Sequence, residues 1–157
     1  MNEKDEEKLI VTKIKEGTVI DRIPPGKALK VLEVLGIDTN YPYTVALAIR
    51  VSSKKTGLKD IVKIKGKELN KKEVHKLSFI APNATVNIIK GYHVIQKEKI
   101  QIPDIVEEFI KCLNPNCISN SNEPVSSKFR VISKKPLVLR CVYCDRLLEG
   151  ENLQAQL

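Results

Sequence analysis

The alternation of apolar and polar residues predicts a series of strands in the first hundred residues. Runs rich in Val, Ile and Thr favour extended backbone, and they span residues 9–14, 17–23, 43–51, 60–65, 85–90 and 92–97. The run at 43–51 is apolar almost throughout and predicts a buried strand, whereas the alternation at 60–65 predicts a half-exposed one. Gly91 separates the last two runs and predicts a hairpin turn.

Two segments between these strands predict helices. In the first, between Pro25 and Gly36, apolar residues recur at helical spacing: Ala28, Leu29, Leu32 and Leu35. The second begins at Asn70, which can cap it together with Glu73 in a capping box, and it must end before Pro82.

The resulting order is β-α-β-β-α-β, which predicts an α+β fold: a ferredoxin-like antiparallel sheet with two helices on one face. The charged residues 1–8 precede it as a flexible tail. Ile102-Pro103-Asp104 interrupts the pattern and is interpreted as a linker. We therefore expect a first domain over residues 1–101 and a second over residues 102–157.

The second domain is predicted to be a small all-β unit built around cysteines. Residues 104–112 favour one short helix after Pro103. Residues 128–133 and 136–141 predict a hairpin that turns at Lys134-Lys135.

Composition narrows the choice of partner and compartment. Formal net charge is +8, which favours an anionic partner such as a nucleotide, a nucleic acid or an acidic protein surface. The amino-terminal residues are charged and carry no apolar signal-peptide core, and no apolar run is long enough to span a membrane. A cytoplasmic protein without membrane contact is expected.

All four cysteines lie in two short motifs, Cys112-x4-Cys117 and Cys141-x2-Cys144, separated by 23 residues. Two cysteine pairs on separate loops are typical of a closed, structural zinc site with four thiolate ligands. Two disulfides would need an oxidising compartment, and a redox-active C-x-x-C would leave the first pair unexplained. A catalytic zinc would need an open position, usually with a His or carboxylate ligand.

Candidate catalytic chemistry is sparse elsewhere. His75 and His93 have no nearby nucleophile or acidic partner in the sequence, and motifs of common enzyme families are absent. Lys63 and Lys97 lie in or at the end of predicted strands, where a rigid backbone can direct an ammonium group at a phosphate. With Asp21 available for ribose hydroxyls, a nucleotide pocket is conceivable.

A basic sheet joined to a zinc ribbon also fits a nucleic-acid-binding protein. Such sheets usually present stacking aromatic residues on their central strands. The stretches YTVALAIR, DIVKIK and TVNIIK contain only one aromatic residue between them, at the start. The nucleic-acid interpretation is therefore the alternative, and no nucleic-acid partner is expected.

Longer segments resemble the regulatory chain of aspartate carbamoyltransferase. They are GTVIDRIPPGKALKVL, LKDIVKIKGKEL, APNATVNIIKGYHV, CLNPNCISN, EPVSSKF and LRCVYC, in the family's order and spacing. The resemblance extends from about Leu9 to beyond Cys144.

This resemblance implies a non-catalytic chain with a nucleotide-binding domain and a zinc domain. Regulatory chains of the family form dimers through the N-terminal sheet, and the zinc domain binds catalytic trimers of pyrimidine biosynthesis. CTP inhibits, ATP activates, and UTP acts together with CTP.

The resemblance also implies individual site residues. Nucleotide-binding positions would be Val11, Thr12, Lys13, Ile14, Asp21, Arg22, Ile61, Lys63, Asn87, Ile89, Tyr92, Val94 and Lys97. Asn114 and Asn116 match positions that contact the catalytic chain. Arg22 replaces a family histidine and adds permanent charge near the phosphates, Thr12-Lys13 replaces an acidic residue followed by a small one, and the spacer before Glu123 is one residue longer.

Overall fold

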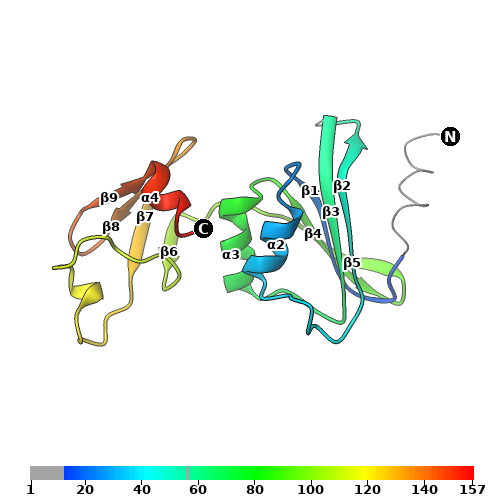
Figure 1. Cartoon of the computed structure of the whole chain (residues 1–157), viewed down its shortest axis with the longest axis horizontal. Coiled ribbons are helices and arrows are strands. Elements are labelled where there is room, and N and C mark those ends of the chain that lie inside the picture. The colour runs from blue at the N-terminus through cyan, green and yellow to red at the C-terminus, as the bar shows by residue number, and fades with distance from the viewer. Residues whose placement is uncertain (1–12, 56) are drawn as a thin grey trace. The chain divides into compact units, whose positions relative to one another are not determined.

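The chain divides into two compact units, Met1–Gln101 and Ile102–Leu157 (Figure 1). The structure is a computed structural model that describes residues 13–55 and 57–157. The strand predicted at 9–14 and the tail predicted at 1–8 lie wholly or mostly outside the described residues.

The first unit is an antiparallel sheet with two helices, as the sequence predicts. Its elements are β1 (Glu16–Ile23), α2 (Ala28–Val34), β2 (Val45–Ser53), β3 (Gly57–Lys65), α3 (Lys71–Ile80), β4 (Thr85–Lys90) and β5 (His93–Lys99). The strand order is β2-β3-β1-β4-β5, and every neighbouring pair is antiparallel. Helices α2 and α3 lie together against one face of this sheet (Figure 1). The other face of the sheet is called the open face below.

Strand alternation assigns alternate residues to the two faces. Ile20 pairs with Val62 on one side and with Val86 on the other, so these three side chains form a row under the helices. Val31 of α2 and Leu77 of α3 belong to the same buried cluster. The residues on either side of this row along each strand therefore face away from the helices.

Helix α3 begins as predicted, with a complete capping box. The Asn70 side chain accepts a hydrogen bond from the Glu73 backbone N–H at 2.9 Å, and the Glu73 carboxylate accepts one from the Asn70 N–H at 2.9 Å. These two bonds satisfy donors that the first turn of a helix cannot satisfy internally. The helix ends at Ile80, before Pro82.

The expected burial of β2 and β3 is wrong in both cases. β2 is an edge strand in which Leu47 is 37% and Ile49 is 44% exposed, whereas β3 lies inside the sheet with Lys59 and Asp60 buried. Polar residues are tolerated inside β3 because they have partners, and periodicity alone cannot show them. In α2, Leu29 is 64% exposed although its spacing suggested the apolar face, and Val31 is buried instead.

The second unit contains a small sheet of order β6-β7-β8-β9. Its elements are β6 (Ile105–Glu107), a 3-10 turn at Ile118–Asn120, β7 (Lys128–Lys134), β8 (Leu137–Cys141), β9 (Leu147–Glu149) and a helix, α4 (Gly150–Gln154). The predicted β7–β8 hairpin is confirmed. The short helix predicted at 104–112 is wrong, because Ile105–Glu107 pairs with β7 and buries Val106 opposite Phe129.

No helix in the described part of the chain is long and apolar enough to cross a membrane.

Asp60 is buried and connects three segments of the first unit through hydrogen bonds of its carboxylate. Its Oδ2 accepts from the backbone N–H groups of Gly26 (2.8 Å) and Ala28 (3.0 Å), at the start of α2. Its Oδ1 accepts from the Arg50 N–H at 2.9 Å, where β2 has a bulge. The carboxylate therefore fixes the position of α2 over the sheet.

Asp60→Ala should lower the free energy of unfolding by about 3 kcal/mol, because three N–H groups lose their acceptor and each costs at least about 1 kcal/mol when buried. Asp38→Ala is the matched control, since exposed Asp38 accepts one bond, from the Asn40 N–H. Its effect should stay below about 1 kcal/mol. Urea unfolding measures both, and equal effects would contradict the proposed role of Asp60.

Candidate metal centre and nucleotide-binding face

The second unit brings the four cysteines into one cluster. Their Sγ atoms all lie within 4.8 Å of one another. Cys112 and Cys117 come from the loop that follows β6, Cys141 ends β8, and Cys144 lies in the turn before β9. Cys112, Cys117 and Cys141 are buried and Cys144 is partly exposed. The folded chain therefore gathers the two motifs that are separated in the sequence.

Sulfur spacing in this cluster fits a tetrahedral metal site. The Cys112 Sγ lies 3.6 Å from the Cys144 Sγ, and the Cys117 Sγ lies 3.6 Å from the Cys141 Sγ. A tetrahedron of thiolates about 2.3 Å from zinc has edges of about 3.8 Å. The four cysteines are free thiols, so the disulfide interpretation is not supported.

Polar side chains hold the first cysteine loop in shape. The Asn120 amide donates to the carbonyl oxygens of Cys112 (2.8 Å) and Asn114 (2.7 Å). The Ser119 hydroxyl lies 3.1 Å from the Cys117 Sγ. Such contacts around the ligands orient them for a metal. Asn120 and Ser119 were not singled out from the sequence, although both lie within the CLNPNCISN segment.

The thiols differ in acidity. Burial raises the pKa of Cys112 to about 12, and burial also raises the pKa of Cys141. Burial raises the pKa of Cys144 as well, but hydrogen bonds from the Arg146 backbone and the Asn114 side chain outweigh it and lower that pKa to about 7. Closely spaced thiolates repel one another, so a cation is needed before all four can ionise together.

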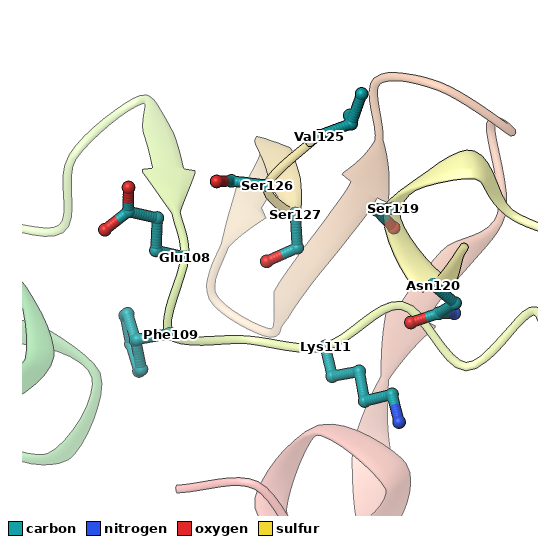
Figure 2. Close-up of a pocket in the computed structure, with 8 residues that line it drawn as sticks. All are labelled: Glu108, Phe109, Lys111, Ser119, Asn120, Val125, Ser126 and Ser127. Carbon is teal, nitrogen blue, oxygen red and sulfur yellow. The ribbon is translucent and has the colours of Figure 1, made fainter. Parts of the chain in front are cut away.

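A pocket of about 350 Å³ lies beside the first cysteine loop (Figure 2). Its lining residues come from the segment after β6, the 3-10 turn and the segment before β7: Glu108, Phe109, Lys111, Ser119, Asn120, Val125, Ser126 and Ser127. Of the two predicted catalytic-chain contacts, Asn116 is exposed, while the Asn114 side chain accepts a hydrogen bond from the Asn116 N–H within the loop.

In the first unit, three predicted nucleotide-binding residues align across the sheet. Lys63 pairs with Val19, Val19 pairs with Asn87, and Asn87 pairs with Lys97. Directly paired residues of antiparallel strands share a face, so Lys63, Asn87 and Lys97 form a row on the open face. Beside Val19 in this row, Ala48 and Ile61 form a small apolar cluster on the same face.

Asp21 lies next to this row and carries an ion pair. Lys59 Nζ lies 3.1 Å from the Asp21 Oδ1, and the Arg22 N–H donates to the same oxygen at 2.7 Å. Arg22 lies in the β1 bulge with a positive φ of 57°. The sequence analysis missed Lys59, but alternation along β3 places Lys59 on the same face as Ile61 and Lys63.

Other predicted positions are more scattered. Ile89 is buried beside Gly17, whereas Tyr92 and Val94 are more than half exposed around the β4–β5 turn. Lys13 and Ile14 precede β1, and Val11 and Thr12 lie outside the described residues.

Comparisons with known proteins cover both units. Residues 9–101 match the family model of the aspartate carbamoyltransferase regulatory chain, allosteric domain, and residues 104–154 match the metal binding domain of the same chain. The chain belongs to the family of aspartate carbamoyltransferase regulatory chains. The non-catalytic role and the metal-binding domain that the sequence predicted are thereby confirmed, and the nucleic-acid alternative is not favoured.

Curated relatives of this regulatory chain carry the same description. The regulatory chain of Pyrococcus horikoshii is 53% identical over 150 residues, which cover 95% of this chain and 98% of the relative. That of Hyperthermus butylicus is 49% identical over 150 residues, covering 95% and 94%. That of Thermoplasma acidophilum is 48% identical over 148 residues, covering 94% and 98%.

Zinc affinity of this regulatory chain should rise with pH, because protonated thiols must lose their protons to bind the ion. Cys112, with a pKa of about 12, is protonated in the metal-free chain at neutral pH. Below its pKa of about 7 the Cys144 thiol is protonated too, so one more proton must leave for each ion that binds. The slope of log affinity against pH should therefore be larger by about one in that range. Competition with a chelator measures this slope, and a pH-independent affinity would contradict thiolate ligation.

Proposed function

We propose that the open face of the first unit binds the nucleoside triphosphates CTP, ATP and UTP as allosteric effectors. The row of Lys63, Asn87 and Lys97 carries this proposal, because it places two cations at fixed positions on either side of an amide. Lysine ammonium groups bind phosphate, and an asparagine amide can both donate to and accept from a base or sugar.

The apolar cluster around Ala48 and Ile61 supplies a surface against which a flat base can pack. Asp21 is held by Lys59 and by the Arg22 N–H, so its carboxylate is already oriented for ribose hydroxyls. The Arg22 guanidinium presents several donors that suit phosphate oxygens and would favour any triphosphate. Together with Ile89, Tyr92 and Val94, these residues form the proposed effector site. Lys13, Ile14, Val11 and Thr12 complete it in the proposal.

We also propose that the second unit holds one zinc ion per chain through Cys112, Cys117, Cys141 and Cys144. Thiolates are soft ligands that favour zinc, and four of them leave no position open for a substrate. The ion would cross-link two loops of the chain and would take no part in catalysis. Thiols must remain reduced to bind it, which suits the cytoplasm.

The proposed partners are the catalytic trimers of aspartate carbamoyltransferase and a second regulatory chain. Asn114 and Asn116 lie in the first cysteine loop, whose shape would depend on the zinc ion, so contacts there would depend on it too. In the first unit, β2 is an edge strand with Leu47 and Ile49 exposed, which supports dimer formation through this sheet.

Regulation would follow from differential binding to two states of the assembled enzyme. An effector that prefers one state shifts the equilibrium toward it, and substrate changes effector affinity by the same factor. Coupling free energies of about 1–3 kcal/mol are typical of such systems. In this proposal residues 1–101 receive the effector and residues 102–157 contact the catalytic chain.

Lys97→Ala should weaken CTP and ATP binding about tenfold, because a charge-assisted contact to phosphate is lost and solvent screens part of its strength. Lys30→Ala is the matched control: it removes the same charge from α2, on the opposite side of the sheet. Calorimetric titration of the assembled enzyme measures both. Unchanged affinity in Lys97→Ala would count against this site, and equal losses in both variants would indicate an effect of net charge alone.

Cys141→Ser should abolish association with catalytic trimers, because a serine oxygen is a poor zinc ligand and the cluster would lose the ion. Native mass spectrometry of the mixed subunits measures the assembly, and the free trimers should remain active. Chelated wild-type chain should dissociate likewise and reassemble when zinc is restored, which controls for irreversible damage. Association of the metal-free chain with catalytic trimers would contradict this mechanism.

A further inference from the structure

The Gln156 side chain is bound to the backbone next to the first cysteine. Its Oε1 accepts from the Lys111 N–H at 2.7 Å, and its Nε2 donates to the Lys111 carbonyl at 2.9 Å. A single amide thus supplies both the acceptor and the donor that a residue of a neighbouring strand would supply. Lys111 directly precedes Cys112, so these bonds act one residue from a thiol of the cluster.

The backbone of Cys112 itself is bound by a second side chain. The Asn120 amide donates to the Cys112 carbonyl at 2.8 Å. Lys111 and Asn120 both line the pocket beside the loop, and Figure 2 shows them on separate segments of the chain. Two side-chain amides, one from the 3-10 turn and one from the turn after α4, therefore hold consecutive residues of one short segment.

Cys112 needs such support because regular structure does not provide it. Strand β6 ends at Glu107, and Lys111 and Cys112 lie in neither a helix nor a strand. Cys141, in contrast, belongs to β8 and pairs with Phe129 in the sheet. The sheet can position Cys141 without help, whereas Cys112 depends on side chains.

Gln156 is itself well placed for this task. Leu153 in α4 is 1% exposed and anchors the helix in the second unit. The Gln156 N–H then donates to the Leu153 carbonyl at 3.0 Å, which continues the helical turn beyond Gln154. The amide therefore projects from an anchored turn rather than from a free segment.

We propose that Gln156 is a positioning residue of the metal centre, which fixes the backbone at Lys111 so that the Cys112 thiolate is already oriented for the ion. This inference rests on the proposed zinc site. Residues that orient metal ligands commonly change metal affinity by at least about tenfold when they are removed. The Gln156 amide would mainly slow the detachment of Cys112, which lies outside the sheet.

The experiment compares Gln156→Ala, Gln156→Glu and the control Gln154→Ala in the full zinc-loaded chain. Gln156→Glu keeps the acceptor for the Lys111 N–H but loses the donor to the Lys111 carbonyl. Gln154 is an exposed glutamine at the end of α4, two residues before Gln156. Zinc transfer to a chromogenic chelator should be about tenfold faster in Gln156→Ala, intermediate in Gln156→Glu and unchanged in Gln154→Ala.

A second measurement separates positioning from general destabilisation. Alkylation with N-ethylmaleimide, followed by peptide mass spectrometry, reads each cysteine of the zinc-loaded chain separately. In Gln156→Ala, Cys112 should react faster than in the wild type while Cys141 stays protected.

The outcomes distinguish this inference from the zinc site on which it rests. A wild-type chain that binds no zinc would overturn both. A wild-type chain that holds zinc, with a Gln156→Ala variant that releases it at the wild-type rate, would overturn only the role of Gln156. An equal rise in reactivity at all four cysteines would also overturn that role, because it would indicate loss of overall stability.

Discussion

Four thiols that meet within a few ångströms are the constraint on which the second unit depends. The unit Ile102–Leu157 is too short to be stabilised by a large apolar core, and its fully buried large residues are few: Phe129, Ile110, Leu139 and Leu153. Burial raises the pKa of Cys112 and Cys141, so these two thiols keep their protons at neutral pH without a cation. A structural zinc ion typically contributes on the order of 10 kcal/mol to such a fold. Metal binding and folding are therefore expected to be one process in this unit.

In the first unit the two faces of the sheet have different roles: one packs against the helices and the other carries the proposed effector site. Ile20, Val62 and Val86 face the helices, and the residues between them on the same strands face outward. On β3 this alternation directs two consecutive buried charged residues to opposite faces of the sheet. Lys59 fixes Asp21 on the open face, and Asp60 fixes the start of α2 on the helix face. The proposed effector site and the helix layer are thus connected through adjacent residues of one strand.

Local rules predicted the parts of the fold that local interactions determine. The capping box at Asn70 and Glu73, the hairpin at Gly91 and the order of helices and strands all follow from short-range patterns. The errors concern tertiary context. Residues 105–107 resembled a helix but form a strand because β7 offers a partner, and 43–51 resembled a buried strand although β2 lies at an edge.

The candidate sites likewise divide into residues that the sequence indicated and residues that only the structure shows. Spacing alone indicated that the four cysteines belong together, because cysteine pairs in a reducing compartment have few other uses. The side chains that support them, Asn120, Ser119 and Gln156, carry no such signal, since amides and hydroxyls are common on any surface. Lys59 was missed because a lysine in an alternating strand is usually exposed, and its ion pair with Asp21 offsets the cost of its burial.

The most direct test of the closed metal centre is X-ray absorption spectroscopy of the zinc-loaded chain at the zinc edge. The structure predicts a single shell of four sulfur atoms at about 2.3 Å with no lighter ligand. A nitrogen or oxygen atom in that shell, or fewer than four sulfur atoms, would contradict a structural site made by Cys112, Cys117, Cys141 and Cys144.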